Sequence, residues 1–318
     1  MNARCALATA ASLFWDRRLC RPRALWRIVM FVLLRALLML GLSAAATVAG
    51  PWASATAMGN VATMAGATLL AAYVCARWVD RRSHSGMGLP PSRANWHELG
   101  LGLALGAAMM MATVGVGLVS GWLKVGAIWA GYAGPGSLAL SLSLWLLVGL
   151  HEEVWARGYL LTSLTEGLCT RWLSPRWALL LAWAGTSVYF GLLHADNPSA
   201  TPASTVAVMA AGLLLGLGVL LTGRLGLSIG IHITWNLFQG TVFGLPVSGH
   251  RVSPFNLFAL QAVGPPRWTG GEFGPEGGLL GLIGLATGLV GLLLLIKWRT
   301  GRLALAAPPL LDEAAIEH

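Results

Sequence analysis

Eight apolar stretches, each close to the ~20 residues that a helix needs to cross a lipid bilayer, dominate this sequence. Only 10% of the 318 residues are charged and 56% are hydrophobic, whereas a soluble domain carries about 25% charged residues. The surface therefore cannot face water on all sides, which excludes an ordinary soluble enzyme, a disordered chain and a disulfide-stapled secreted module. We predict an all-α polytopic membrane protein whose helices form one bundle, at 27–49, 57–78, 99–119, 137–160, 177–197, 203–222, 226–244 and 279–297.

Basic residues gather in short clusters between these stretches, so the net charge of +9 does not predict a nucleic-acid-binding surface. With eight spans the clusters fall on one side, and the positive-inside rule places both termini in the cytoplasm. The preference for Arg over Lys, beside abundant Ala, Gly and Leu, is typical of a GC-rich bacterial genome and predicts a multi-pass inner-membrane protein. The clusters are Arg17, Arg18, Arg21, Arg23 and Arg27; Arg77, Arg81, Arg82 and Arg93; Arg171 and Arg176; Arg224; and Lys297, Arg299 and Arg302.

Two segments between the predicted helices differ from short turns. Residues 79–98, which include Pro90, Pro91 and Trp96, are expected to form a cytoplasmic connector near the interface. Residues 245–278 are expected to form a long external loop without a helix of its own. Such a loop is usually mobile or functional.

Ionisable side chains inside three of the predicted helices indicate a functional site, because each costs roughly 2.5–3.5 kcal/mol to insert into a membrane. The second, third, sixth and eighth predicted helices hold almost none. This concentration predicts one convergent polar site. Its members are His151, Glu152, Glu153 and Arg157 in the fourth helix, His194 at the end of the fifth, and His232 and Asn236 in the seventh.

Helical spacing separates the two adjacent carboxylates. Glu153 and Arg157 are four residues apart, so they share a helical face and can neutralise each other. Glu152 points about 100° away, which leaves it free to face a cavity. Taken alone, a Glu–Arg ion pair in a membrane protein is as often purely structural as it is part of a functional site.

The two later helices carry the other groups that hydrolysis needs. Phe190 and His194 share one face, and His232 shares another with Asn236, whose amide is a neutral donor. A carboxylate, imidazoles and an amide are what water activation and oxyanion binding require. At ~1.5 Å per residue, His194 would lie about 25 Å and His232 about 10 Å from the cytoplasmic surface. For the two imidazoles to contact one substrate, either the fifth helix must start deeper, or the seventh must start well before Leu225 or tilt.

The motifs of other intramembrane proteases are missing. Trp155 stands where HExxH would require its second His, which excludes a zincin-type site-2 protease. The sequence has no GxSG and no GxGD, so it does not support a rhomboid or presenilin type.

Three motifs stand in a fixed order, each on its own apolar helix: EExxxR at 152–157, FxxxH at 190–194 and HxxxN at 232–236. In this arrangement they resemble the CPBP intramembrane endopeptidases, also called the Abi family, which comprises CAAX proteases and bacteriocin-processing enzymes. The resemblance implies a catalytic membrane domain at 79–300. A helix pair with a basic cytoplasmic N-terminus would precede it at 1–78, and a short cytoplasmic tail would follow at 301–318.

The resemblance also implies roles for individual residues. Glu152 and His194 would activate the attacking water, and His232 and Asn236 would stabilise the oxyanion. No cofactor is expected, but members of the family were long described as metalloproteases, and zinc would then be bound by Glu152, His194 and His232. The neutral Asn236 would be a poor zinc ligand, which favours a metal-free mechanism. The supporting residues would be Glu153, Arg157 and Phe190.

We therefore expect an intramembrane endopeptidase that hydrolyses a membrane-associated peptide or protein tail with water activated by Glu and His. A prenylated CAAX protein, a peptide pheromone and a bacteriocin precursor all fit as substrates. The alternative is a non-enzymatic membrane protein, either a proton-coupled transporter or an inactive immunity-type family member. Transporters usually show paired discontinuous helices in related halves, which this sequence lacks, and the intact motifs argue against inactivity. The pattern assigns no oligomeric state.

Overall fold

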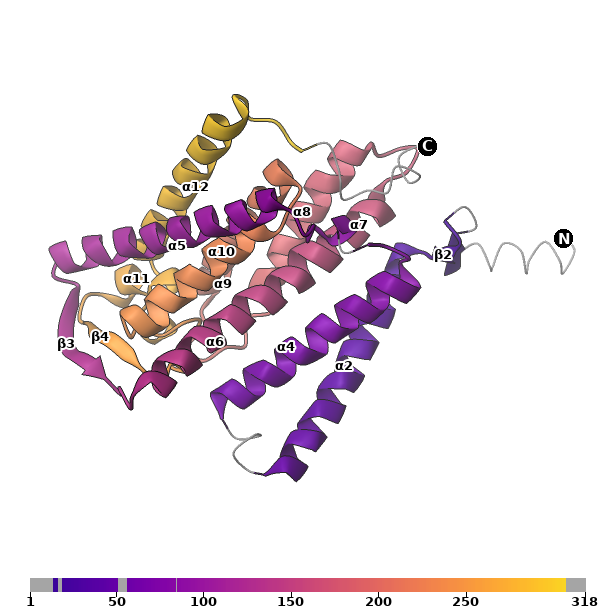
Figure 1. Cartoon of the computed structure of the whole chain (residues 1–318). Helices are drawn as coiled ribbons and strands as arrows, with labels where there is room; N and C mark the ends of the chain where they lie inside the picture. Colours follow the sequence, from indigo (N-terminus) through magenta and orange to yellow (C-terminus); the bar gives the residue numbers. More distant parts are fainter. Residues whose placement is uncertain (1–13, 17–18, 51–55, 84, 307–318) are drawn as a thin grey trace, which may run out of the picture.

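The computed structural model describes residues 14–16, 19–50, 56–83 and 85–306, and most of them are helical (Figure 1). The predicted all-α polytopic membrane fold is confirmed. The main helices are α2 (Ala24–Ala49), α4 (Ala57–Val74), α5 (Arg93–Val119), α6 (Pro135–Glu153), α7 (Leu161–Leu168), α8 (Pro175–Leu192), α9 (Pro202–Thr222), α10 (Gly226–Leu237) and α12 (Leu279–Thr300). Three π-helical segments continue them: η1 (Cys75–Val79) after α4, η3 (Val154–Leu160) between α6 and α7, and η4 (Phe238–Val242) after α10.

Within the described part of the chain, six helices are long and apolar enough to cross a membrane. Two of the eight predicted spans, 177–197 and 226–244, correspond to the shorter helices α8 and α10. Every residue of α10 from Gly226 to Asn236 is buried, so this helix is enclosed by its neighbours and is not exposed to lipid. The count of eight therefore stays a prediction.

The helix predicted at 99–119 begins earlier, at Arg93. The Ser92 side chain accepts a hydrogen bond from the Asn95 N–H at 3.3 Å, which caps the first turn. Pro90 and Pro91 stop the helix from starting sooner, because a residue before proline avoids the helical region. The connector predicted at 79–98 therefore ends at Ser92, and its Trp96 belongs to α5.

The prediction of a loop without a helix of its own at 245–278 is wrong. This segment contains strand β4 (Asn256–Ala262), the short helix α11 (Pro266–Thr269) and the 3₁₀ turns η5 (Gly271–Phe273) and η6 (Pro275–Gly277). Strand β4 pairs antiparallel with β3 (Leu123–Ala130) at one end of the bundle (Figure 1). The remaining short elements are β1 (Trp15–Asp16), β2 (Arg21–Pro22) and η2 (Ser85–Met87).

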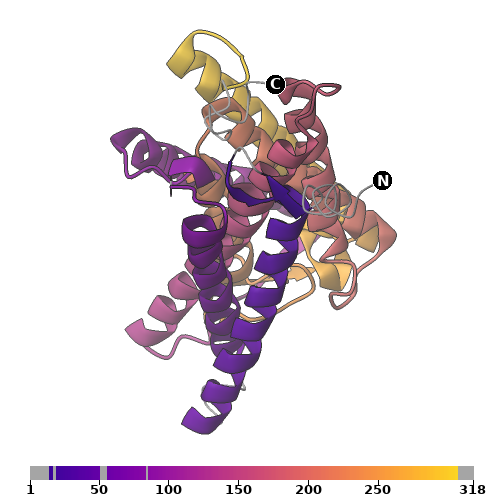
Figure 2. The same ribbon diagram turned by 90° about the vertical axis from the view of Figure 1, so that its right-hand side faces the viewer.

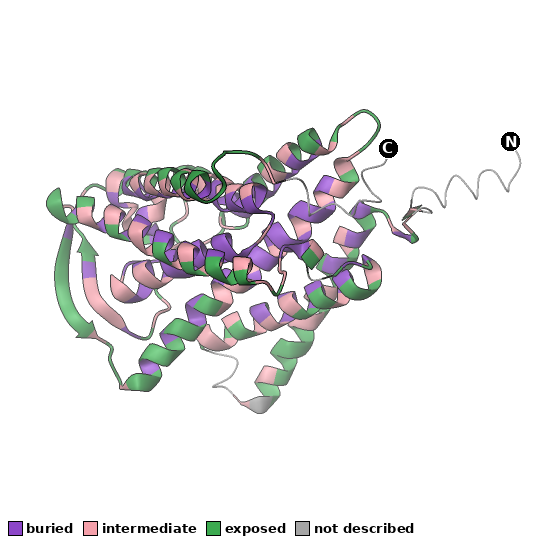
Figure 3. Cartoon of the chain, turned by 45° about the horizontal axis from the view of Figure 1, so that its top comes forward, coloured by how far each residue is buried: buried purple, intermediate pink, exposed green. Residues whose placement is uncertain are grey.

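Helix α10 packs directly on the backbone of α5 through glycines on both helices. A Cβ atom at Gly102 would lie 3.0 Å from the Ile231 nitrogen, and one at Gly230 would lie 2.6 Å from the Leu103 nitrogen. Membrane helices use such small residues to approach closely. Buried residues gather in this interior, while exposed residues follow the outward faces of the surrounding helices (Figure 3).

Helices α2 and α4 lie side by side at the periphery of the bundle (Figures 1 and 2). A group of five charged side chains, here called the N-terminal ion cluster, joins this pair to α7. Glu166 of α7 accepts from Arg21 at 3.2 Å, from Arg27 at 2.8 Å and from Arg82 at 2.6 Å, and Arg27 also bonds Asp80 at 2.6 Å. All five side chains are buried. Arg17 and Arg18, and residues 307–318 of the predicted tail, lie outside the described residues.

A second group of ion pairs joins the turn before α10 to α5 and to the last helix, α12. Glu98 of α5 bonds Arg224, and it also accepts from Arg299 of α12 at 2.9 Å. The hydrogen bonds that Arg224 donates to the Glu98 carboxylate raise the pKa of Arg224. The start of α10 is therefore held between α5 and α12.

Candidate active site

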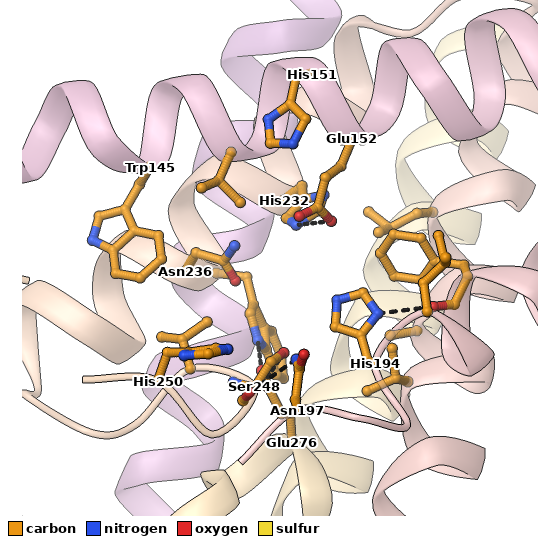
Figure 4. A pocket seen from close by; sticks show the side chains of 18 of the residues that line it. Trp145, His151, Glu152, His194, Asn197, His232, Asn236, Ser248, His250 and Glu276 are labelled. Atoms are coloured by element: carbon orange, nitrogen blue, oxygen red, sulfur yellow. Dashed lines mark hydrogen bonds and ion pairs between the residues drawn. The ribbon is translucent and has the colours of Figure 1, made fainter. Parts of the chain in front are cut away.

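A cavity of about 550 Å³ lies at the centre of the molecule, between the peripheral helix pair and the rest of the bundle. Four of the predicted site residues line it, and their side chains point toward a common space (Figure 4). They are Glu152 on α6, His194 just after α8, and His232 and Asn236 on α10. The structure thus brings together residues that the sequence places up to 84 positions apart.

The two glutamates at the end of α6 have opposite environments. Glu152 faces the cavity, and its side chain is 25% exposed. Glu153 is fully buried, and its carboxylate accepts a bond of 2.7 Å from Arg157. The predicted ion pair therefore forms, and the turn of about 100° between neighbouring positions leaves only Glu152 in the cavity. The π-helix η3 begins directly after Glu152 and Glu153, and such irregular helical turns are frequent at functional sites.

His232 lies between the two carboxylates. Its Nδ1 is 2.8 Å from Glu153 Oε1, and its Nε2 is 3.8 Å from Glu152 Oε2. Because a carboxylate can only accept, the Nδ1 atom carries a proton that it donates to Glu153. Glu153 therefore fixes the orientation of the imidazole, which is a role that the helical spacing did not predict.

His194 lies two residues after the end of α8, where the chain turns away from the helix. Its Nδ1 lies 2.8 Å from the carbonyl oxygen of Phe190, so Nδ1 donates to the backbone and Nε2 is left as an acceptor. The Phe190 ring lies 4.9 Å from the His194 ring, tilted by 51°, and 6.2 Å from the His232 ring in an edge-on arrangement. Arg157 covers the same phenyl ring at 4.3 Å.

The separation in depth estimated from helix rise is therefore wrong, since both imidazoles flank one phenyl ring. The estimate assumed that α10 begins at the membrane surface. A helix that is buried on every side does not have to begin there, because its polar ends contact protein and not lipid.

Part of the cavity wall comes from residues that sequence reasoning missed. Glu276, from the segment 245–278, bonds the Ser248 N–H, accepts from Ser248 Oγ at 2.8 Å and accepts from Trp235 Nε1 at 3.2 Å. Asn197 donates to the Ser248 carbonyl at 3.0 Å (Figure 4). These bonds hold the turn 247–250 against the cavity, opposite Glu152.

Arg35 of α2 is a further lining residue that was missed. It lies inside the first predicted span, at 27–49, where an ionisable group is costly. The cost of placing an arginine in a membrane helix is the signal in the sequence that indicates Arg35. His151 also lines the cavity, and its Nδ1 lies 2.7 Å from the Leu147 carbonyl.

A metal ion would have to be held by the same side chains. Among the described residues, no group of three or more His, Cys, Asp and Glu side chains is placed to hold a metal ion. The set proposed for zinc comprises Glu152, His194 and His232. The Nδ1 atoms of both imidazoles face Glu153 and a backbone carbonyl, contacts that zinc-bound imidazoles also make, so the Nε2 atoms of His194 and His232 are the ones that could bind zinc.

Residues 134–238, from the residue before α6 to the end of α10, match the family model described as type II CAAX prenyl endopeptidase Rce1-like. This segment is an Rce1-like domain. The match contains all three motifs and confirms, for this segment, the resemblance to the CPBP endopeptidases, and it supports an intramembrane endopeptidase in general. No curated protein and no solved structure matches the chain. The Rce1-like domain includes neither Arg35 nor Glu276, which reach its cavity from outside.

Proposed function

We propose that the protein hydrolyses a peptide bond in a membrane-associated peptide or protein tail with water activated by Glu152 and His194. The observation that carries this proposal is the unequal environment of the two adjacent glutamates. Glu153 is committed to Arg157 and His232, whereas Glu152 faces the cavity beside three further polar groups.

The mechanism begins with a water molecule between Glu152 and His194. Glu152 takes one proton from this water, and the free Nε2 of His194 accepts a hydrogen bond that orients it. The resulting hydroxide attacks the scissile carbonyl carbon. Glu152 then delivers its proton to the leaving amine as the carbon–nitrogen bond breaks.

His232 and Asn236 stabilise the negative charge that develops on the carbonyl oxygen. Protonated His232 donates Nδ1–H to Glu153 and Nε2–H to the oxyanion, while the amide of Asn236 donates a second bond. The two residues are one helical turn apart on α10 and reach the cavity from the same side. Zinc is no part of this proposal.

The substrate is proposed to be the apolar end of a membrane-associated chain. The description of the matching family, a CAAX prenyl endopeptidase, favours a prenylated CAAX protein as the substrate. A peptide pheromone and a bacteriocin precursor are the other proposed substrates. The bacterial inner membrane with both termini in the cytoplasm is part of the same proposal. A comparison of peptide C-termini in the native host with and without the protein would identify the substrate.

Replacement of Glu152 by Gln tests the proposed base. The change keeps the shape of the side chain and removes only its basicity, so cleavage of the identified substrate should be abolished in protein that folds and inserts normally. Near-normal turnover of Glu152→Gln would refute the assignment. Transport without any cleavage by the unaltered protein would favour the transporter alternative.

A further inference from the structure

A second cavity, of about 440 Å³, lies between the neighbouring helices α5 and α12 on the outer surface of the bundle (Figure 1). Residues 101–105 of α5 and residues 291–298 of α12 form it, and we call it the α5–α12 groove. Its lining residues, all within the described part of the chain, are distinct from those of the active-site cavity. Leu294 and Trp298 are 62% and 76% exposed, so a ligand can reach the groove from outside.

The wall of the α5–α12 groove is apolar or aromatic throughout. Both helices are long and apolar enough to cross a membrane, so lipid surrounds this face of the bundle. The rise from Gly291 to Trp298 is ~10 Å, which matches the first part of an acyl chain that runs along α12. At Gly291 a Cβ atom would lie 2.5 Å from Leu105 Cδ1, so the groove depends on a residue without a side chain at this position.

One end of the groove is closed by the ion pairs of Glu98. Glu98 lies three residues before Leu101, and Arg299 lies four residues after Leu295, so both are one helical turn beyond the groove. The 2.9 Å bond between Arg299 and Glu98 therefore crosses from α12 to α5 at this end. Glu98 also bonds Arg224, and one carboxylate against two guanidinium groups leaves one positive charge in excess.

The two arginines at this end keep donors for a ligand. In the described part of the chain, Arg299 bonds Glu98 through Nη1, and Arg224 bonds it through Nε and Nη2, whereas a guanidinium carries five N–H donors. Their side chains are 24% and 30% exposed, so an acceptor can approach them from the surface. Lys297, also exposed, adds a further positive charge in the last turn of α12.

The position of Trp298 indicates the depth of this end in the membrane. Tryptophan is enriched where the lipid headgroups meet the hydrocarbon, and the Trp298 side chain projects from the rim of the groove. A lipid whose acyl chain lies in the groove would therefore have its headgroup level with the arginines. A zwitterionic headgroup would leave their excess charge uncompensated, whereas an anionic headgroup would neutralise it.

We propose that the α5–α12 groove binds an anionic phospholipid, with one acyl chain along 291–298 and the phosphate at Arg299 and Arg224. Basic pockets between membrane helices bind lipid headgroups in this way, and a guanidinium matches a phosphate oxygen pair geometrically. The bound lipid joins α12 to α5, which is the helix on which α10 packs. This site is separate from the proposed peptidase chemistry, and its test needs no substrate.

Photo-crosslinking in vesicles tests the site directly. Full-length protein is placed in equal parts of phosphatidylglycerol and phosphatidylcholine with identical acyl chains, and either one or the other lipid carries a diazirine on its chain. Mass spectrometry then maps the labelled residues. At 291–298 the anionic lipid should label about 10- to 30-fold more than the zwitterionic lipid, because about two positive charges favour it. The exposed segment 33–42 of α2 is the internal control and should be labelled equally by both.

Variants separate the groove from its charged end. Gly291→Phe fills the groove and should bring the labelling ratio at 291–298 close to one, whereas Gly115→Phe on α5 has open space and should leave it unchanged. Arg299→Gln and Lys297→Gln should each lower the ratio about five-fold. Arg176→Gln is their matched control, since it removes an exposed cation from the start of α8.

A ratio near one at 291–298 in the wild type would overturn the inference. An excess that persists in Gly291→Phe and in Lys297→Gln would also overturn it, and would assign the preference to the general charge of the surface. If neither lipid labels 291–298 while both label 33–42, protein covers the groove, either a second copy or residues 307–318, and the inference is wrong. None of these results bears on the proposed peptidase function, which the Glu152→Gln variant tests.

Discussion

The buried Glu153 provides the sharpest test of how the site is held together. Its carboxylate accepts from Arg157 at 2.7 Å and from the His232 ring at 2.8 Å, and none of its surface is exposed. Replacement of Glu153 by Gln keeps the volume but leaves the Arg157 cation without a counter-charge. It also exchanges the charged acceptor that orients His232 for a neutral amide oxygen, which is a weaker acceptor.

The expected cost follows from the burial of both partners. Removing one member of a buried ion pair destabilises a protein by about 3–5 kcal/mol, which lowers the folded-to-unfolded ratio about 100- to 4000-fold. Arg157 keeps a bond of 3.1 Å to the Gly212 carbonyl and its contact with Phe190, which places the expected loss toward the lower figure. The turnover rate should also fall by at least ~100-fold, because the imidazole loses the charged partner that holds its orientation and stabilises its protonated form.

Unfolding by SDS in mixed micelles, followed by tryptophan fluorescence, measures the stability of each variant. The double variant Glu153→Gln/Arg157→Met removes the unpaired cation and should recover most of the lost stability without recovering activity. Glu152→Gln should lose activity and unfold like the wild type. Wild-type stability of Glu153→Gln, or a double variant no more stable than the single one, would refute the reasoning.

Four further outcomes can be measured. Asn236→Ala should lower kcat by ~100- to 1000-fold with little change in KM, because an oxyanion donor acts only in the transition state; a raised KM at normal kcat would make it a substrate-positioning residue. Gly230→Ala should destabilise the protein by about 1–3 kcal/mol in SDS titration, since a methyl group would meet the backbone of α5, whereas Gly100→Ala has open space and should be neutral. Glu276→Ala should increase proteolytic nicking at 247–250 and lower kcat/KM, while the exposed Glu272→Ala should leave both unchanged. Chelator-washed protein should keep its activity and contain no stoichiometric zinc by elemental analysis, and activity that tracks zinc occupancy would contradict the glutamate mechanism.

Local patterns predicted the parts of this molecule that local forces determine. Apolar length located the main helices, and the cost of ionisable groups in lipid located the four residues that meet in the cavity. The helical angle between consecutive residues was enough to separate Glu152 from Glu153, whose different burial the structure shows.

The remaining features depend on contacts between distant segments. Strands β3 and β4 are 126 or more positions apart along the chain. Strand β3 is mostly exposed and β4 is mostly half-buried on both faces, so neither has the alternation that marks a strand with one buried face. Glu276 gains its role from hydrogen bonds to Trp235 and Ser248, which no periodicity within a loop can indicate. The meeting of His194 and His232 required knowledge that α10 is enclosed by other helices.

The N-terminal ion cluster makes assembly of the enzyme depend on the order of synthesis. Arg21 and Arg27 precede their shared partner Glu166 by 145 and 139 positions. At 5–20 residues per second the ribosome needs roughly 7 to 30 s to make that interval. Asp80 is made within this time and is then the only carboxylate of the cluster until Glu166 follows, so the first two helices are synthesised before their docking partner. The cavity wall that carries Arg35 is therefore completed only after α7 has emerged, and the nascent chain cannot hold a substrate before then.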